Sequence, residues 1–395
     1  MNILILGIDG YIGWPLAMSL AKRGHDVRGI DNLSRRVHVR NIGSDSVFPI
    51  LDIQERIAKF NEIHKCHIRF YKGDLLDYSF VRNIFQQTQP DSIIHLAEQP
   101  SAPFSMISQE HAIYTQHNNI EGNLNVLYAM KDYAPNSHLV KLGTMGEYGT
   151  PNIDIPEGFI ELQSDGRKEI LPFPKLPGSI YHLSKVHDSA NVHFACRVWN
   201  LRATDIMQGV VYGTRTPEMI DDSLMTRFDF DECFGTVINR YCAQAAVDHP
   251  LTPYGQGKQK RGFIDLVDSI QCLTIAAENP ASAGEYRVFN QLDEVYDVTE
   301  LAEHVSAVGR KLGLNVKIKP IANPRKEKEN HQYNVEHKHL HNLGFRPTRN
   351  IVESLTIMLT DLHKYRDRIA ERKSVILPQI RWDDRELTEK QLIKR

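Results

Sequence analysis

The stretch MNILILGIDGYIG, residues 1–13, decides the fold that we expect for this chain. Its apolar run to Leu6 predicts a strand, its glycines predict a tight turn, and the apolar spacing over residues 15–23 predicts a helix. A second strand over residues 27–30 ends at Asp31 and completes a βαβ unit. The alternation continues, with strands expected over residues 68–71, 92–96 and 138–142 and helices over residues 80–87 and 118–131. We therefore expect an α/β fold with a doubly wound parallel sheet that helices cover on both faces.

The later part of the chain interrupts this alternation. Residues 150–179 are rich in proline, glycine and acidic residues, and a loop that long inside a compact domain is usually functional. We interpret it as a flap over the substrate, with a plain surface loop as the alternative. Residues 217–253 are expected to be mostly helical, and residues 262–290 to return to the sheet. The chain then divides into a Rossmann-type nucleotide-binding domain, residues 1–205, and a smaller C-terminal substrate-binding lobe, residues 206–395, which ends in a solvated helix and tail.

Three glycines, Gly7, Gly10 and Gly13, give the first stretch the spacing GxxGxxG, a variant of the dinucleotide-binding motif. Glycine permits the tight turn and lets the backbone approach a pyrophosphate, which sits on the helix N-terminus. Asp31 follows the next strand, where its carboxylate can accept hydrogen bonds from an adenosine ribose and would repel a 2′-phosphate. The pattern therefore favours NAD as the cofactor over NADP.

Two neighbouring arginines, Arg35 and Arg36, complicate this choice because an arginine there can hold the 2′-phosphate of NADP. Asp74, after the third strand, is expected to meet the adenine, with a helix N-cap as the alternative. We expect further contacts with the cofactor from residues beside the glycine turn and after the strands: Tyr11, Ile12, Asn32, Arg35, Asp74, Leu75, Leu96 and Asn118.

A tyrosine and a lysine four residues apart, Tyr181 and Lys185 in YHLSK, predict the reactive groups. On a helix they project from the same face, so the ammonium of Lys185 would lower the pKa of Tyr181 toward neutrality. Such a tyrosine can take the proton of a substrate hydroxyl while a nicotinamide takes the hydride. The pair alone is a weak signal, and it gains weight here because the chain begins with a dinucleotide site. Thr144 lies upstream in KLGTMGEYG.

Composition excludes several classes of protein. The formal net charge of −2, with acidic and basic residues interleaved, gives no field for nucleic acid or an anionic membrane. The five cysteines are scattered without a CxxC pair, which favours reduced thiols in a cytoplasmic protein. The eighteen histidines include no HExxH and no clustered ligand spacing, so no metal site is expected. No apolar run approaches membrane-spanning length, and strand-like residues begin at Asn2, which leaves no room for a signal or transit peptide.

Longer peptides carry a resemblance to a known family. GIDGYIG, HNNIEGNLNVL, the TMGEYG segment and YHLSK occur in the order found in the extended short-chain dehydrogenase/reductases, the superfamily of nucleotide-sugar epimerases and dehydratases. EQPSAPFSMI, VKLGTMGEYGTPNIDIPEG, YHLSKVHDS, QGVVYG and NPRKEKE resemble, within it, the UDP-sulfoquinovose synthases. The resemblance implies that UDP-glucose and sulfite are converted to UDP-sulfoquinovose with NAD recycled in each turnover, by an enzyme of the hydrolase-type carbon–sulfur bond class.

The resemblance also implies roles for individual residues. Thr144, Tyr181 and Lys185 would form the catalytic triad, with Thr144 bound to the hydroxyl on carbon 4 and Lys185 to the nicotinamide ribose. Four further residues would contact the UDP group of the substrate: Gln208, Arg240, Arg261 and Arg325. By analogy with the superfamily, the helices around residues 118–131 and 181–199 would pair in a homodimer.

The acid and base for water elimination have two candidates in the sequence. Dehydratases of the superfamily place Asp and Glu directly after the catalytic Thr, whereas this chain has Met145 and Gly146. The remaining candidates are His182, which titrates near neutrality, and Glu147. The alternatives are a packing histidine and a buried structural carboxylate.

Three other functions remain open at this stage. A UDP-sugar 4-epimerase or a dehydratase could use the same triad. A redox-sensing protein could bind NAD without chemistry, although such proteins often lose the Tyr or Lys that this chain keeps. UDP-sulfoquinovose could feed a sulfolipid or a glycan, and the sequence does not choose between them.

Overall fold

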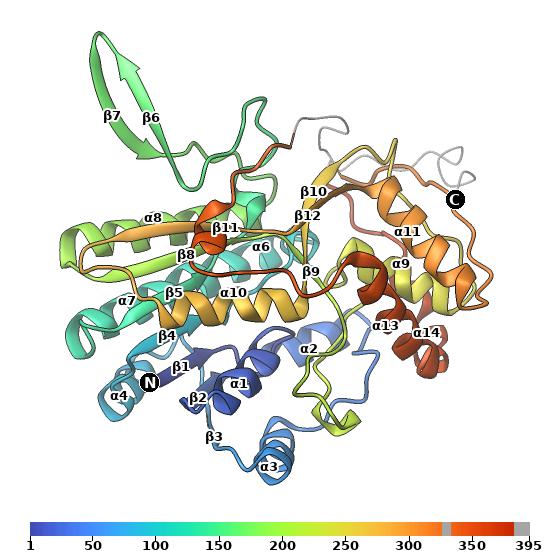
Figure 1. The fold of residues 1–395 in the computed structure, drawn as a ribbon, viewed down its shortest axis with the longest axis horizontal. Coiled ribbons are helices and arrows are strands. Elements are labelled where there is room, and N and C mark those ends of the chain that lie inside the picture. The colour runs from blue at the N-terminus through green and yellow to red at the C-terminus, as the bar shows by residue number, and fades with distance from the viewer. Residues whose placement is uncertain (326–332, 383–395) are drawn as a thin grey trace.

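The computed structural model describes residues 1–325 and 333–382. Its centre is a seven-stranded sheet in which every pair of neighbouring strands is parallel (Figure 1). The strands, in order across the sheet, are β11 (Tyr286–Gln291), β8 (Arg202–Gln208), β5 (His138–Leu142), β4 (Ser92–His95), β1 (Asn2–Leu6), β2 (Asp26–Asp31) and β3 (Ile68–Lys72). The strand order reverses between β1 and β4, and ligands bind such sheets beyond the carboxyl ends of the strands at this point.

Strand β1 shows why the sheet is buried on both faces. Ile3 and Ile5 pack into one core with helices α1 (Gly13–Lys22) and α10 (Leu266–Glu278). Leu4 and Leu6 pack into a second core, on the opposite face, with α4 (Tyr78–Thr88), α7 (Gly122–Tyr133) and α8 (Ile180–Trp199). Successive side chains of a strand point to opposite faces, so an all-apolar strand requires helices on both sides. The expected doubly wound α/β sheet is confirmed.

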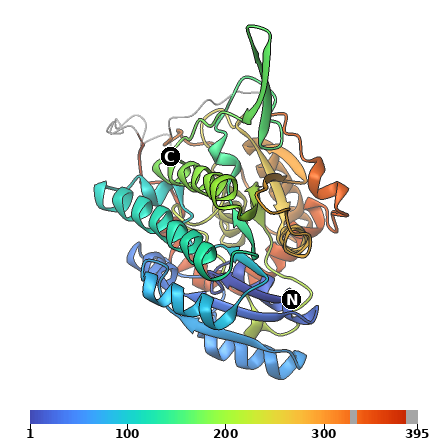
Figure 2. The same cartoon turned by 90° about the vertical axis from the view of Figure 1, so that its left-hand side faces the viewer.

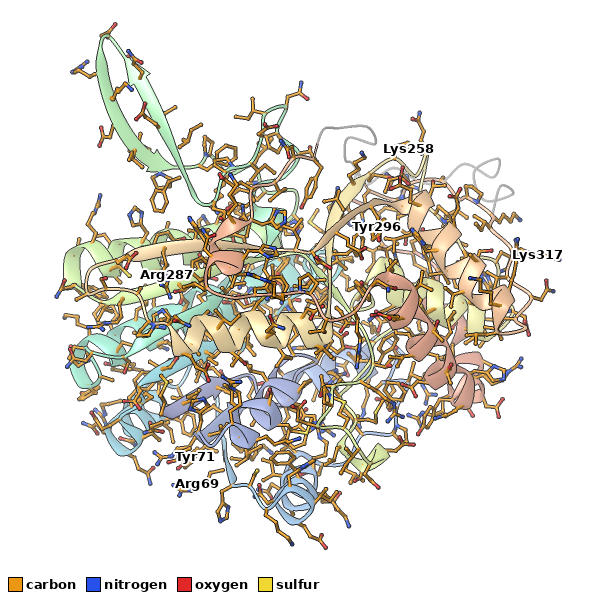
Figure 3. The ribbon with its side chains drawn as sticks, viewed as in Figure 1. Arg69, Tyr71, Lys258, Arg287, Tyr296 and Lys317 are labelled. Carbon is orange, nitrogen blue, oxygen red and sulfur yellow. The ribbon has the colours of Figure 1, made fainter. Side chains whose placement is uncertain are left out.

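The two edge strands of the sheet and several shorter helical segments complete this part of the fold. Figure 3 shows Arg69 and Tyr71 on β3 and Arg287 on β11, the two edge strands. The remaining helical segments of this part are α2 (Ser34–Asn41), α3 (Ile53–His64), α5 (Ala102–Ser105), α6 (Gln109–Gln116), the π-helical turn η1 (His117–Glu121) and the 3₁₀ turn η2 (Met145–Glu147).

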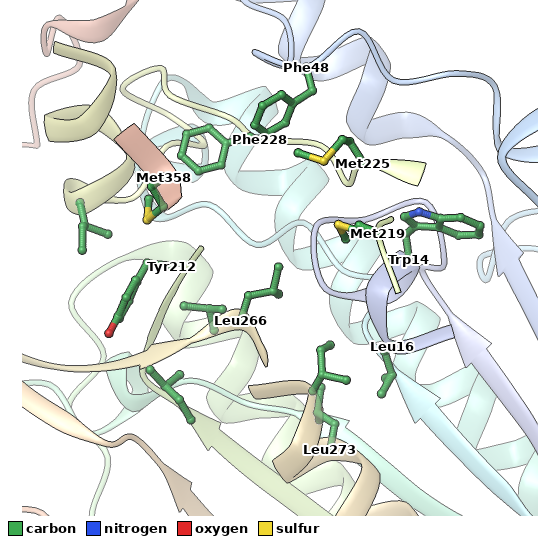
Figure 4. Close-up of a cluster of buried hydrophobic side chains, with 14 of the residues drawn as sticks. Trp14, Leu16, Phe48, Tyr212, Met219, Met225, Phe228, Leu266, Leu273 and Met358 are labelled. Atoms are coloured by element: carbon green, nitrogen blue, oxygen red, sulfur yellow. The ribbon is translucent and has the colours of Figure 1, made fainter. Parts of the chain in front are cut away.

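A smaller part lies beside the carboxyl ends of the strands (Figure 1). It contains a three-stranded sheet in the order β12 (Glu294–Asp297), β10 (Lys260–Asp265), β9 (Val210–Tyr212). Its helices are α9 (Val237–Ala246), α11 (Val298–Lys311), α12 (Lys338–Asn342), α13 (Ile351–Lys364) and α14 (Arg366–Ala370), with 3₁₀ turns η3 (Asp222–Leu224) and η4 (Lys373–Ile376). Figure 4 shows that one apolar cluster joins the two parts, because Trp14 of α1, Leu273 of α10 and Met358 of α13 belong to it.

Two expectations for the later chain have different outcomes. Within residues 262–290, β11 pairs with β8 in the central sheet and α10 covers one face, whereas residues 262–265 belong to β10 of the smaller sheet. The prediction that residues 217–253 are mostly helical is wrong, because only η3 and α9 are helical there. Met225 and Phe228 are buried in an irregular backbone, so contacts with the core replace local helix formation. Of the expected solvated helix and tail, residues 364–395, the part from residue 383 onward lies outside the described residues.

Residues 150–179 contain a β-hairpin, where the sequence pattern predicted a loop. Strands β6 (Phe159–Ser164) and β7 (Arg167–Pro172) pair antiparallel across Asp165 and Gly166, both with positive φ. Asp-Gly between two strand-forming segments is a strong hairpin signal, so this hairpin could have been predicted from the sequence. Both views show the hairpin projecting away from the body (Figures 1 and 2). In this conformation it does not cover the cavity described below.

No helix among the described residues is both long and apolar enough to cross a bilayer. In the same residues, no group of three or more His, Cys, Asp or Glu side chains could hold a metal ion.

Candidate active site

A cavity of about 470 Å³ lies beyond the carboxyl ends of the central strands, between the two parts of the chain. With the exception of Glu147, every residue that the sequence predicted for the site lines this cavity. They are Gly7, Gly10, Tyr11, Ile12, Gly13, Asp31, Asn32, Arg35, Asp74, Leu75, Leu96, Asn118, Thr144, Tyr181, His182, Lys185, Gln208, Arg240, Arg261 and Arg325. Residues from both parts of the sequence therefore share one site.

The glycine turn forms a close-fitting cradle at one end of the cavity. Gly7 has φ +91°, and a Cβ there would lie 2.8 Å from the carbonyl carbon of Leu96. A Cβ on Gly13 would lie 2.1 Å from the carbonyl oxygen of Gly7. Side chains cannot occupy either position, so the backbone stays open at the N-terminus of α1, where a pyrophosphate is stabilised by N–H groups. The geometry fits a dinucleotide.

Asp31 lies at the end of β2 with both carboxylate oxygens engaged by backbone N–H groups, at 2.9 Å from Asp9 and 2.7 Å from Leu33. Burial, with a smaller effect of the Asp9 carboxylate, raises the pKa of Asp31 to about 6. Arg35 donates to Asp229 at 2.8 Å, and Arg36 donates to Asp9 at 2.6 Å and 2.8 Å. Because carboxylates already engage both guanidinium groups, this end of the cavity favours NAD.

Asp74 lies at the same end of the cavity. It accepts a hydrogen bond from the side chain of Asn32 at 2.9 Å. The helix N-cap role suggested as its alternative belongs to Asp77, which accepts from the N–H of Phe80 at 3.1 Å and caps α4. Asp74 is therefore left to face the cavity.

Tyr181 and Lys185 come from the first turns of α8, which Ser179 caps. The ammonium of Lys185 contacts the carboxylate of Glu98 and the carbonyl oxygen of Leu142. The prediction that Lys185 lowers the pKa of Tyr181 is wrong for this structure. Burial, followed by the carboxylates of Glu98 and Glu147, raises the pKa of Tyr181 instead. Burial is the largest cause, and Glu98, whose carboxylate pairs with the ammonium of Lys185, adds to it.

His182 faces the cavity beside Tyr181, and the two rings lie 5.1 Å apart between centroids. Its Nδ1 is 3.1 Å from the hydroxyl of Ser179. A Cβ on Gly146 would lie 2.2 Å from Nε2 of His182, so the ring occupies the space that a side chain at position 146 would need. Burial, and then the charges of Arg261 and Arg325, lower the pKa of His182 to about 4. The imidazole is neutral at pH 7 and can accept a proton.

Glu147 is fully buried and does not line the cavity. Its carboxylate accepts from Lys175 at 3.0 Å and Ser189 at 2.9 Å, and it also accepts from the N–H of Thr144 at 3.3 Å. Burial alone would raise the pKa of Glu147, but the ammonium groups of Lys175 and Lys141 outweigh it and lower the pKa to about 2. The structure therefore favours the structural alternative for Glu147 over the acid/base role.

Three arginines gather at the other end of the cavity, from separate elements. Arg240 on α9 donates to the hydroxyl of Tyr254 at 2.7 Å, and its guanidinium lies 5.0 Å from that ring. The guanidinium of Arg325 lies 5.9 Å from the same ring. Arg261 is on β10, and its positive charge lowers the pKa of His182. Guanidinium groups bind diphosphates well because they present forked donors.

Several residues that line the cavity were not predicted from the sequence, among them Glu98, Tyr254, Arg227 and Asp229. Glu98 is the first residue of EQPSAPFSMI, which follows β4, so the position after a parallel strand was a usable signal. The others lie in segments without a local pattern, and only tertiary contacts bring them to the cavity.

Known proteins of similar sequence show the family to which the chain belongs. The sequence pattern of the NAD dependent epimerase/dehydratase family matches residues 3–290. The chain belongs to this family. Within it, the UDP-sulfoquinovose synthase of Sulfolobus acidocaldarius is 51% identical over 383 residues, 97% of this chain and 98% of that protein. The chloroplastic UDP-sulfoquinovose synthase of Spinacia oleracea is 48% identical over 382 residues, 96% of this chain and 79% of that protein. These relatives place the chain in the UDP-sulfoquinovose synthase branch of the family.

Solved structures of the same family share the fold. The UDP-glucose 4-epimerase of Thermotoga maritima, with UDP-glucose, has a TM-score of 0.68 at 19% identity and covers 92% of this chain and 99% of its own. The UDP-glucuronic acid 4-epimerase of Bacillus cereus, with UDP-glucuronic acid and NAD, gives the same values. Membership of the NAD dependent epimerase/dehydratase family agrees with the cradle at Gly7 and Gly13, and NAD is the cofactor that these residues fit.

Proposed function

We propose that the chain converts UDP-glucose and sulfite to UDP-sulfoquinovose. The observation that carries this proposal is the identity of 51% and 48%, over nearly the whole chain, to two proteins named UDP-sulfoquinovose synthase. The cavity supports it, because it brings Thr144, Tyr181 and Lys185 together with a dinucleotide cradle and an arginine cluster. The reaction is balanced without an external oxidant: bisulfite adds to carbon 6 of the sugar, and the hydroxyl of carbon 6 leaves as water.

Bound NAD supplies the redox chemistry, since it accepts hydride from carbon 4 of the sugar and returns it. Tyr181 removes the proton of the hydroxyl on carbon 4 and later gives it back. Thr144 positions that hydroxyl, and its own place is fixed as the cap of η2, where its Oγ1 accepts from the N–H of Gly146 at 3.1 Å. The resulting 4-keto sugar has an acidic hydrogen on carbon 5.

His182 is the proposed acid and base for the elimination step. Its neutral ring can take the proton from carbon 5 and pass it to the hydroxyl leaving carbon 6. Bisulfite then adds through sulfur to carbon 6, and its proton reaches carbon 5 through the same imidazole. Gly146 supports this role, because the dehydratase Glu expected at that position is absent and the ring of His182 fills its space.

The diphosphate of the sugar nucleotide is assigned to Arg240, Arg261 and Arg325, with Gln208 beside them. Burial is the main cause that lowers the pKa of His182, and the positive charges of Arg261 and Arg325 add to it, so two of these arginines also lower the proton affinity of the base.

The association state and location are part of the proposal. A homodimer through α7 and α8 is supported by exposed apolar side chains on these helices, Tyr128, Phe194 and Val198. A cytoplasmic setting is supported by the free thiols of all five cysteines. The proposed enzyme is classed as a hydrolase of carbon–sulfur bonds because, in the reverse reaction, water would displace sulfite from carbon 6.

Chromatography coupled to mass spectrometry of the nucleotide sugars tests the function directly, because the chromatography separates UDP-galactose from UDP-glucose, which has the same mass. The protein is incubated with UDP-glucose and NAD, with and without sulfite, beside a Tyr181→Phe variant. We expect a UDP-sulfohexose only with sulfite and only in the wild type. UDP-galactose in both wild-type samples would instead identify a 4-epimerase, and absence of any turnover would favour a protein that only binds NAD.

A further inference from the structure

Glu98 is a buried carboxylate inside the active-site cavity that the mechanism above does not use. It follows β4, lines the cavity, and its side chain is 4% exposed. One carboxylate oxygen pairs with the ammonium of Lys185. The other, Oε1, has no hydrogen-bond partner among the described residues, and Nε2 of His95 lies 3.8 Å from it. A buried charged oxygen without a partner is unfavourable unless a ligand or function engages it.

The pairing changes what Lys185 can do for Tyr181. An isolated ammonium one helical turn away would favour the phenolate, but an ammonium paired with a carboxylate presents almost no net charge. The lysine is further restrained because its Nζ donates to the carbonyl oxygen of Leu142. Lys185 is therefore held in place, and the carboxylate of Glu98 offsets its positive charge.

Other charged groups surround Tyr181 from every element packed against it. Lys141 on β5 favours the phenolate, whereas Glu147 of η2 and Asp188 of α8 act with Glu98 against it. His182 on α8 is neutral, because its pKa is lowered to about 4. Among these groups, Glu98 exerts the largest electrostatic effect on Tyr181.

We propose that Glu98 is a positioning residue that holds and neutralises Lys185, so that Tyr181 keeps its proton through the middle of the reaction. The inference rests on the proposed function in one respect, namely that Tyr181 carries the proton from carbon 4. Elimination and sulfite addition separate the removal of this proton from its return, and a strongly acidic phenol would lose it to solvent in between. With Glu98 and Lys185 paired, Lys141 still favours the phenolate, and oxidised NAD, when bound, would add the positive charge of its nicotinamide ring.

The test is an ultraviolet difference titration of tyrosinate in the NAD-bound enzyme. Subtracting Glu98→Gln/Tyr181→Phe from Glu98→Gln isolates Tyr181 in the variant, and Tyr181→Phe does the same for the wild type. We expect the pKa of Tyr181 to fall by about 1 unit or more in Glu98→Gln, because one negative charge is lost and Lys185 is released. Glu157→Gln, which removes a carboxylate that is also buried but lies outside the cavity, should leave Tyr181 unchanged.

Kinetics provide the second readout. The acid limb of kcat/KM should move to lower pH by the same amount in Glu98→Gln. An unchanged Tyr181 titration, or an upward shift, would overturn the inference, and Glu98→Met serves as the uncharged variant if Glu98→Gln does not fold. The titration needs no turnover, so failure of the proposed synthase reaction would be seen separately, as absence of the sulfite-dependent product in the wild type.

Discussion

Replacing Gly146 with alanine tests the proposed base more selectively than removing the base itself. The new Cβ would lie 2.2 Å from Nε2 and 2.3 Å from Cδ2 of His182, whereas ordinary contact begins at 3.4 Å. The imidazole must therefore retreat by about 1.2 Å, a displacement from which we expect a loss of about 10²-fold in a positioned chemical step. His182 itself is retained, so its chemistry is present but misplaced.

The assay separates the steps of the reaction. We expect exchange of solvent deuterium into carbon 5, and formation of UDP-sulfohexose, to fall about 10²-fold in Gly146→Ala. Oxidation at carbon 4, followed by the absorbance of the reduced nicotinamide in a single turnover without sulfite, should change far less, because the three atoms nearest the new methyl group all belong to His182. Overpacking should also lower the free energy of unfolding, by about 1–3 kcal/mol, which thermal unfolding measures.

Gly178 supplies the matched control. It lies just before the cap of α8, its φ is not positive, and a Cβ there meets nothing within 4 Å. Gly178→Ala should therefore keep wild-type exchange and product formation. Wild-type exchange into carbon 5 in Gly146→Ala would refute the reasoning, since His182 would then not be the group whose position limits elimination.

Three further outcomes are expected from other parts of the structure. Gly13→Ala should lose bound NAD on gel filtration, because its Cβ would lie 2.1 Å from the carbonyl oxygen of Gly7; retention of the wild-type NAD content would contradict the cradle. Glu147→Gln should lower the free energy of unfolding at pH 7 by about 3–5 kcal/mol, because it breaks a buried ion pair with Lys175. Since the folded-state pKa of Glu147 is depressed to about 2, its contribution in the wild type is present above about pH 5 and is lost as the pH falls toward 2, a dependence that denaturant unfolding should show in the wild type and not in the variant. Replacing hairpin residues 160–171 with a short glycine linker should leave kcat unchanged, because none of them lines the cavity, and a large loss would restore the flap interpretation.

The βαβ unit was predictable because its determinants are local. Apolar residues 3–6, the glycine turn and Asp31 lie within one short segment, and each follows from strand, turn and helix preferences of neighbouring residues. The same holds for Tyr181 and Lys185, which are one helical turn apart on α8.

The electrostatics of the site could not be predicted in this way. Glu98 and Lys185 are 87 residues apart, so no local pattern showed that Glu98 pairs with Lys185 and adds to the effect of burial in raising the pKa of Tyr181. Glu147 is buried outside the cavity and accepts hydrogen bonds from Lys175 and Ser189, which no local pattern connects to it. The hairpin at Asp165 and Gly166 is a different case, because its turn signal was present in the sequence and was not used.

Deuterium on carbon 4 of UDP-glucose tests the central claim most directly. The protein, with bound NAD, is given this labelled substrate and sulfite, and the product is analysed by mass spectrometry and proton NMR. The account predicts a UDP-sulfohexose that keeps the deuterium on carbon 4, because the hydride removed there returns to the same carbon within one turnover. A labelled UDP-galactose without sulfur would contradict the claim, as would a sulfonated product that has lost the label.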